Sequence, residues 1–350
     1  MASFRAVVVM LLLAASLAIA GPASAQEFSG NVDVILRANG ILDINGDNGD
    51  NRITLCQNPD DAEEFTVIII TSSFEYETET RNGVTKDVRI NMRGGDDVVQ
   101  LNGNAAPPAD CDDFYPPPPP LQGDIGANDD ICHADDHGCP GMLFPRDVRV
   151  FLGSGYNSFS GYEFGVVDDL TVRGGSGFDA VSLRYVNVWD RADINTLGGN
   201  SSVFVRDSYF GRSTWRAGSG ADRFEFSRTD LGNRPLITTS AGVDNVFLQA
   251  VAEGRVTINT GSGEDLLRTL FYCPDPEGDC GGAESRPYLL NVIMGAHNDR
   301  TVAAIPLIAG DRLNGGSGNQ DTLETFDVGG LATSGGPTIN GYELIVPLEP

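Results

Sequence analysis

Short segments that combine glycine with an oxygen-bearing side chain recur along the chain, and they hold the best candidates for chemistry. Clear copies begin at Gly94 (GGDDVVQL), Gly174 (GGSGFDAVSL), Gly218 (GSGADRFEF) and Gly261 (GSGEDLLRT). Each copy places a carboxylate beside a glycine-rich turn. Calcium and similar hard cations bind several carboxylate and carbonyl oxygens at flexible geometry. The chemistry that these segments indicate is therefore cation binding at turns.

One oxygen-bearing residue per copy aligns the repeats and shows their period. Between Asn157 and Asp265 these anchor residues follow one another every 21 or 22 positions. The first two steps, of 46 and 60 residues, would each contain a degenerate coil or an insertion, and the step of 34 residues before Asp299 contains one coil and about twelve extra residues. The anchor residues are Asn51, Asp97, Asn157, Asp179, Ser201, Asp222, Asp244, Asp265, Asp299 and Gln320.

Positions that were not used for the alignment also repeat. The residue seven places before the anchor is apolar in every copy, from Ile44 to Leu313. The residue two places after it is apolar from Ile53 to Leu267, and the pattern then weakens at Thr301 and Thr322. Glycine stands two places before the anchor in nine copies, and His297 is the exception. Alternating apolar residues around a glycine turn predict a strand, a corner and a second strand.

The repeat predicts an all-β fold, a right-handed parallel β-helix (β-solenoid) with inserted loops. One coil cannot bury its apolar face alone, so the coils must stack and pair their strands in parallel. The right hand follows from the general rule for parallel crossovers. A leucine-rich horseshoe has a similar period but would show a leucine and asparagine consensus. A sandwich is the weaker alternative, since its turns need not share one chemistry.

The segment GGSGFDAVSL at 174–183 resembles the GGxGxDxUx nonapeptide of haemolysin-type (RTX) calcium-binding repeats. The resemblance implies that calcium lies between stacked turns, bound by the aspartate and by carbonyl groups of the glycine-rich loop. This chain has one such turn per coil where the family has two, which favours a few sites, best along Asp222, Asp244 and Asp265. The residues that match the metal-ligand position are Asp97, Asp179, Asp222, Asp244, Asp265 and Asp299.

A structural role for the same side chains is the competing interpretation. Aspartate and asparagine accept hydrogen bonds from their own turns and therefore suit corners without any metal. Stacked carboxylates repel one another, however, unless they are neutralised, protonated or directed into water. Calcium is accordingly the expected cofactor, with a metal-free corner as the alternative.

The N-terminus has the features of a secretory signal peptide at 1–25. Arg5 precedes an apolar stretch, and the small residues at 23–25 stand before Gln26. Residues 26–350 are then expected to form a single β-helix domain in a secreted or extracytoplasmic protein, whether extracellular, at the cell surface or in the periplasm. No other stretch approaches the ~20 apolar residues of a spanning helix, so we expect no membrane insertion.

Two insertions are expected in the solenoid, a Pro/Cys-rich loop at about 104–145 and a smaller Cys loop at about 272–284. The six cysteines of an exported protein are expected to form disulfides. Close spacing pairs Cys132 with Cys139 and Cys273 with Cys280, and elimination leaves Cys56 for Cys111.

The charge of the chain limits its partners. With 49 acidic and 23 basic residues the net charge is −26, which excludes nucleic acid and anionic membranes but suits metal cations. Calcium ions are therefore the first expected partner. An extracellular polysaccharide or a surface protein is the other.

Enzyme functions rank below a structural or surface-interaction role, and we assign no catalytic residue. Asp168 and Asp169 are adjacent in a predicted strand and would face opposite sides. His133 and His137 in CHADDHGC could bind zinc, but an oxidising compartment favours a disulfide between the flanking cysteines. We expect a non-enzymatic protein. The alternative is a polysaccharide-binding or polysaccharide-cleaving β-helix, a lyase or hydrolase.

Overall fold

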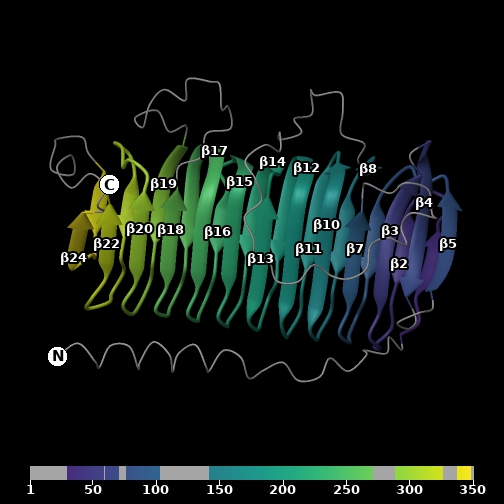
Figure 1. Cartoon of the computed structure of the whole chain (residues 1–350), viewed down its shortest axis with the longest axis horizontal. Coiled ribbons are helices and arrows are strands. Elements are labelled where there is room, and N and C mark those ends of the chain that lie inside the picture. Colours follow the sequence, from purple (N-terminus) through teal and green to yellow (C-terminus); the bar gives the residue numbers. More distant parts are fainter. Residues whose placement is uncertain are drawn as a thin grey trace, which may run out of the picture.

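The computed structural model describes residues 30–58, 60–70, 76–102, 142–270, 288–325 and 337–347. These residues form an all-β parallel β-solenoid of about eight turns, as the sequence predicted, and none of them lies in a helix (Figure 1). No membrane-spanning helix is therefore present among them. The strands are β1 (Asp33–Leu36), β2 (Leu42–Asn45), β3 (Arg52–Asn58), β4 (Asp61–Ile70), β5 (Tyr76–Asn82), β6 (Val88–Asn91), β7 (Val98–Asn102), β8 (Met142–Phe144), β9 (Val148–Phe151), β10 (Asn157–Val166), β11 (Asp169–Arg173), β12 (Asp179–Asn195), β13 (Ser201–Arg206), β14 (Tyr209–Arg216), β15 (Arg223–Asn233), β16 (Leu236–Thr238), β17 (Asn245–Asn259), β18 (Leu266–Leu270), β19 (Tyr288–Ile293), β20 (Arg300–Ala304), β21 (Arg312–Asn314), β22 (Thr322–Thr325), β23 (Thr338–Asn340) and β24 (Leu344–Pro347).

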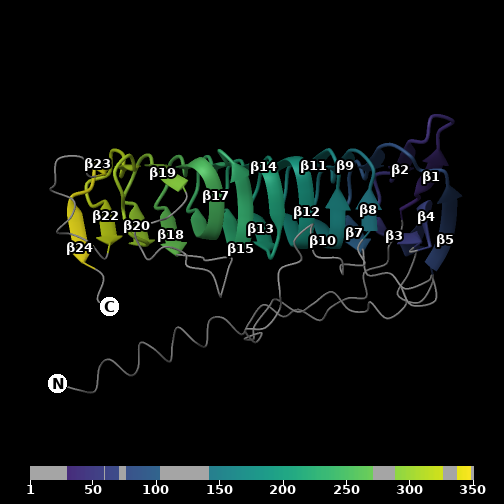
Figure 2. The same cartoon turned by 90° about the horizontal axis from the view of Figure 1, so that it is seen from above.

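The long strand β12 shows how one coil is built. Its buried side chains alternate with exposed ones in three groups, which are separated by bends at Tyr185 and at 189–191. With the glycine turn before Asp179, the coil has three faces and three corners. We call the glycine turn the first corner, the bend at Tyr185 the second and the bend at 189–191 the third. Figure 2 shows these faces stacked along the rod.

The coils stack in parallel and in register. Asp179 lies beside Asn157 on one neighbouring coil and beside Ser201 on the other. Equivalent residues of successive coils therefore form straight columns along the rod, about 4.8 Å apart. The handedness of the solenoid stays a prediction.

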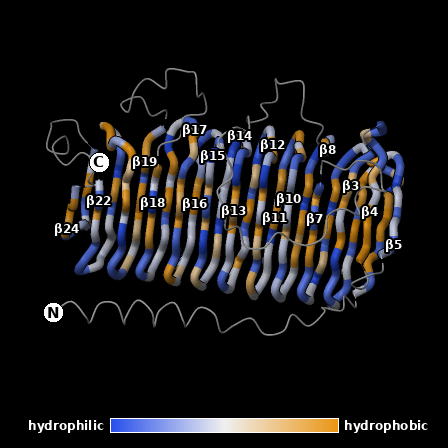
Figure 3. Tube along the Cα trace, viewed as in Figure 1, coloured by the Kyte–Doolittle hydropathy of each residue, from blue (hydrophilic) through white to orange (hydrophobic). Residues whose placement is uncertain are grey.

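The two apolar columns of the repeat form part of one continuous hydrophobic core that runs along the solenoid. The column that begins at Ile44 and the column that begins at Ile53 are at most 1% exposed along their whole length. Trp215 belongs to the first of these and packs edge-on against Phe210 and Phe226. Figure 3 shows apolar and polar residues alternating along the strands.

The long steps of the repeat are insertions and not degenerate coils. Strand β3 pairs directly with β7, and the extra residues between them include an antiparallel hairpin of β4 and β5. Strand β7 pairs with β10 across the step of 60 residues, and β18 pairs with β20 across the step of 34. Asn102 and Leu270, the last described residues before two gaps, both lie at the second corner, five places after Asp97 and Asp265.

Several predicted segments fall on residues that the structure does not describe. These are the signal peptide at 1–25, most of the 104–145 loop, and the 272–284 loop with its cysteines. Met142–Phe144, at the end of the first loop, forms β8, which pairs with β10. Cys56 is buried, and its predicted partner Cys111 lies outside the described residues. The disulfides stay predictions.

One anchor residue was wrong. The register pairs Arg300 with Thr322, which places Asp321, not Gln320, beside Asp299. Asp321 is fully buried and Gln320 is exposed. The coil contains one more residue between Leu313 and its anchor than the others, and the glycine-rich turn gave no sign of it. With this correction the apolar column continues through Leu323, which is also fully buried.

Candidate functional site

The predicted metal ligands form one column inside the first corner. The register brings all six aspartates into line, together with the asparagines and the serine of the other coils. No member is more than 2% exposed, so the side chains point into the solenoid. The corner column consists of Asn51, Asp97, Asn157, Asp179, Ser201, Asp222, Asp244, Asp265, Asp299 and Asp321.

Each aspartate in the second half of the column bonds to the backbone of the coil before it. The N–H of Asp222 donates to Asp244 Oδ1 at 2.9 Å, and the N–H of Asp244 donates to Asp265 Oδ1 at 2.9 Å. The same bond joins Ser201 to Asp222, Asp265 to Asp299, and Asp299 to Asp321. One carboxylate oxygen of each aspartate therefore holds two coils together. The repeat predicted the column but not this ladder.

The second carboxylate oxygen is different. Among the described residues, five of these aspartates have a buried Oδ2 with no hydrogen-bond partner: Asp97, Asp222, Asp244, Asp265 and Asp299. A buried charged oxygen without a partner is strongly unfavourable, so it must gain a proton or a cation. The unpartnered Oδ2 atoms are the strongest sign of a ligand in the column.

Burial also changes the acidity of these side chains. It raises the pKa of Asp97, Asp222 and Asp299 to about 7 and that of Asp265 to about 6. The neighbouring carboxylate adds to the effect, as Asp244 does for Asp222, whereas the backbone N–H bond opposes it. Near neutral pH these four carboxyl groups are therefore balanced between a protonated form and an ionised form.

Asp179 departs from this pattern. Its Oδ1 accepts from Asn157 Nδ2 at 2.9 Å, and its Oδ2 accepts from the N–H of Gly175 at 3.0 Å. Both oxygens are thus satisfied, although burial raises its pKa as well. Asp321 is satisfied in the same way, by the N–H groups of Asp299 and Gly318. The turn that most resembles the calcium-binding nonapeptide therefore has a carboxylate that needs no cation.

Asn157 shows what an amide does at this position. Its Oδ1 accepts the N–H of Asp97 at 3.1 Å, as the aspartate Oδ1 atoms do. Its Nδ2 donates to Asp179 Oδ1 and also to the carbonyl oxygens of Gly153 and Gly155, at 3.3 and 3.5 Å. Because the coils are in register, the unpartnered Oδ2 atoms take the position in the column that Nδ2 has in Asn157. A proton or a cation would take the place of the amide hydrogens.

Glycine keeps the turn backbone of the first corner tightly stacked. Gly242 has a φ of +148°, and a Cβ there would lie 1.6 Å from the carbonyl oxygen of Gly220. Only glycine permits both the backbone conformation and the approach. His297 is the exception, with a φ of 90° on the coil that follows the 34-residue step. The carbonyl groups of successive turns are therefore held close to the column.

Comparison of the chain with known protein families, curated proteins and solved structures finds no match. The chemistry of the column must therefore be argued from its own atoms. No three His, Cys, Asp or Glu side chains converge to bind a metal ion in the described part of the chain. A cation in the column would be bound by one or two carboxylates together with turn carbonyls. The histidines of the CHADDHGC segment lie outside the described residues.

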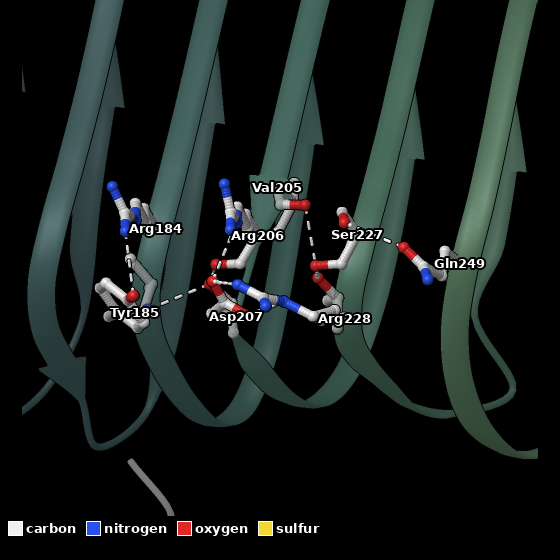
Figure 4. Close-up of polar contacts among 11 residues, drawn as sticks. Arg184, Tyr185, Val205, Arg206, Asp207, Ser227, Arg228 and Gln249 are labelled. Carbon is white, nitrogen blue, oxygen red and sulfur yellow. Dashed lines mark hydrogen bonds and ion pairs between the residues drawn. The ribbon is translucent and has the colours of Figure 1, made fainter. Parts of the chain in front are cut away.

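A second polar cluster, which the sequence did not reveal, lies at the second corner (Figure 4). Asp207 is buried there and forms ion pairs with Arg206 at 3.0 Å and with Arg228 at 2.7 Å. The guanidinium of Arg184 lies 4.7 Å from the ring centre of Tyr185. The stacked residues Glu163, Tyr185, Asp207 and Arg228 all have φ between 50° and 55°.

The contacts at the second corner serve the fold. The ion pair of Asp207 with Arg228 joins neighbouring coils, and two guanidinium groups already neutralise the Asp207 carboxylate. Residues other than glycine pay an energetic penalty of about 1 kcal/mol for a positive φ, which these contacts offset. Glu163, Tyr185, Asp207 and Arg228 share no side-chain chemistry, so no sequence pattern marks this corner.

Proposed function

We propose that this protein is an exported, calcium-binding, non-enzymatic β-solenoid with a structural or surface-interaction role. The observation that carries the proposal is the set of five buried Oδ2 atoms without a hydrogen-bond partner. They lie in one column at the first corner. The residues that provide them are Asp97, Asp222, Asp244, Asp265 and Asp299.

The best candidate sites lie along Asp222, Asp244 and Asp265. These aspartates belong to three consecutive coils, and their Oδ1 atoms are already fixed by backbone N–H groups. A cation between two neighbouring Oδ2 atoms would neutralise both carboxylates and could add carbonyl oxygens of turn glycines such as Gly220 and Gly242. Calcium suits such a site better than magnesium because it accepts carbonyl and carboxylate oxygens at irregular geometry.

Calcium bound here would add a cross-link between coils. Its contribution would be stability and rigidity of the rod, which fits a scaffold that presents its faces to partners. Extracellular modules commonly bind calcium at about 0.1 to 1 mM, and the signal-like N-terminus supports export to such a compartment. The acidic surface attracts cations and repels nucleic acid, which also supports the proposal.

Protonation is the competing way to neutralise the column. It requires no metal and makes the aspartates equivalent to Asn157. The two possibilities differ in their dependence on pH, because a proton occupies Oδ2 mainly below the raised pKa values and calcium mainly above them.

Calcium titration by calorimetry tests the proposal. At about pH 8 we expect saturable binding to the mature protein, weakened at least about tenfold in Asp244→Asn. The control is Asp33→Asn, because Asp33 is an exposed aspartate of β1, outside the column. Absence of saturable binding, or equal binding by the two variants, would contradict calcium sites in the column.

A further inference from the structure

Four large apolar side chains are exposed together at the third corner and on the face between the second and third corners. They are Leu143, Val167, Trp189 and Tyr209, which are 43%, 40%, 41% and 39% exposed. The register aligns Leu143 with Gly165, Gly165 with Asn187, and Asn187 with Tyr209. We call these four residues the Trp189 platform. Contiguous exposed apolar patches on a soluble protein commonly mark a binding surface.

The indole of Trp189 is held in place by a glycine on the neighbouring coil. A Cβ at Gly165 would lie 2.9 Å from Cη2 and 3.0 Å from Cζ3 of Trp189, and 3.2 Å from Cδ1 of Leu143. The ring therefore rests directly against the bare backbone of Gly165, with Leu143 beside it. A ring fixed in this way loses little conformational freedom when a ligand stacks on it.

An irregularity in the coil places Trp189 at the surface. The register between β12 and β14 shifts between Val188 and Arg191, so that two residues, Trp189 and Asp190, face the single residue Gly211. A Cβ at Gly211 would lie 2.1 Å from the carbonyl oxygen of Trp189. The extra residue widens the third corner and leaves the Trp189 side chain on its outside.

The polar groups around the platform carry both signs of charge. Asn187 lies between Gly165 and Tyr209, Asp190 follows Trp189, and Arg191 and Arg212 are aligned at the third corner. Asp230 lies beside Tyr209 in the register, and Asp168, which follows Val167, pairs with Arg146. Amide, carboxylate and guanidinium groups together offer hydrogen-bond donors and acceptors. This mixture suits a neutral ligand rich in hydroxyl groups better than a polyanion.

The size of the platform argues against a protein partner. Four side chains about 40% exposed present roughly 300 Å², whereas each partner of a stable protein complex buries about 800 Å². A chain of sugar rings needs a smaller contact area. Each ring can place its C–H face on an aromatic ring and its hydroxyl groups on neighbouring polar atoms.

We propose that the Trp189 platform binds a neutral polysaccharide, with one sugar stacked on Trp189 and the next extending toward Tyr209. Hydroxyl groups of the sugars bond to Asn187, Asp190 and Arg212. The site lies at the third corner and on the face between the second and third corners, whereas the proposed calcium sites belong to the first corner. It does not depend on calcium.

Fluorescence quenching can test the proposal, because the two tryptophans of the chain differ in exposure. Trp189 is 41% exposed, whereas Trp215 is fully buried in the core. Acrylamide should therefore quench Trp189 and spare Trp215. The probes are neutral hexasaccharides of glucose, galactose, mannose and N-acetylglucosamine, with polygalacturonate and polylysine as charged comparisons. We expect at least one neutral probe to protect Trp189 from quenching, with a saturable dependence on its concentration.

Three variants connect binding to the platform. Trp189→Ala should weaken the neutral probe at least about tenfold by calorimetry, and Gly165→Ala should also weaken it because the new methyl group displaces the indole. Tyr156→Ala is the matched control, because Tyr156 is 71% exposed but lies at the first corner, and it should bind as the unmodified protein does. Melting curves show that each variant is folded.

Other outcomes overturn the proposal. If no neutral hexasaccharide protects Trp189, or if Trp189→Ala binds as tightly as the unmodified protein, the platform is not a polysaccharide site. Protection by polylysine or polygalacturonate alone would assign it to a charged partner instead.

Discussion

The backbone N–H of Asp222 donates to Oδ1 of Asp244 on the next coil, while Oδ2 of the same Asp244 is buried without a hydrogen-bond partner among the described residues. One oxygen of this carboxylate therefore bonds to the backbone, and the other lacks a hydrogen bond. The same division recurs at Asp265 and Asp299. Burial raises the pKa of Asp244 and outweighs the Thr239 hydroxyl group, which lowers that pKa. What neutralises the second oxygen decides how stability responds to pH and to calcium.

Without metal, we expect the protein to lose stability as the pH rises from about 5 to about 8. Burial raises the folded pKa of Asp97, Asp222 and Asp299 to about 7 and of Asp265 to about 6, above the ordinary 3.8. A raised carboxyl pKa means that the folded state binds protons more tightly. The stabilisation is therefore complete below the unfolded pKa and is lost as the pH passes through the folded values. Melting temperatures in chelator should fall across this range.

Burial also raises the pKa of Asp169, Asp179 and Asp244, and these groups change the stability in the same direction. The chain has only three histidines, and hydrogen bonds from the backbone of Asn31 and Gly49 lower the pKa of Asp47, so that it stays ionised. A melting temperature in chelator that is constant or rises between the two pH values would contradict the buried, protonated column.

Replacing Asp244 by asparagine removes the negative charge of the side chain and keeps its shape, so the variant tests the effect of the charge alone. At about pH 8 in chelator we expect Asp244→Asn to melt at or above the temperature of the unmodified protein, because it removes a buried charge and can adopt the bonds of Asn157. Asp244→Ala should lose about 1–3 kcal/mol of unfolding free energy, since the N–H of Asp222 then has no acceptor. Urea unfolding measures both. If the two variants lost the same stability, the ladder bond would not be the cause.

Gly242→Ala should destabilise the rod by more than about 1 kcal/mol. The φ of +148° and the position of a Cβ 1.6 Å from the Gly220 carbonyl oxygen both oppose any side chain. Gly198→Ala is the control, because a Cβ there meets only the Gly175 carbonyl oxygen at 3.7 Å. Equal melting temperatures for the two variants would show that the corner tolerates a wider stacking of its turns.

Asp207→Ala should destabilise the second corner. The side chain of Asp207 is fully buried between Arg206 and Arg228, whose side chains are 29% and 24% exposed. Removing it leaves two partly buried guanidinium groups, which solvent screens in part, and we expect a loss of about 1–3 kcal/mol. Arg223→Ala, which removes an exposed arginine that pairs with the half-buried Glu225, should change stability by less than about 1 kcal/mol. Similar losses in both variants would contradict a structural role for the second corner.

The sequence was sufficient to predict the solenoid and the aspartate column because both follow from a strict repeat. The apolar residues of each coil must face inward, so a period of 21 or 22 residues is enough to bring Asp222, Asp244 and Asp265 into line at one corner. The error at Gln320 arose because one extra residue shifts the anchor without changing the glycine turn.

Other features could not be predicted from the repeat. The division between Oδ1 and Oδ2 depends on the backbone of the preceding coil, which composition does not show. The Trp189 platform depends on Gly165, a residue on another coil with no motif of its own. The ion pairs at the second corner could not be predicted either. Residues such as Asp207 and Arg228 do not recur at the same position from coil to coil.

Thermal unfolding at about pH 8, with calcium and then with excess chelator, tests the central claim most directly. A ligand that binds only the folded state must stabilise it in proportion to its concentration. We predict that the melting temperature of the mature protein rises with calcium, and that Asp244→Asn loses most of this rise. Identical melting curves in chelator and in about 1 mM calcium would contradict calcium binding in the corner column.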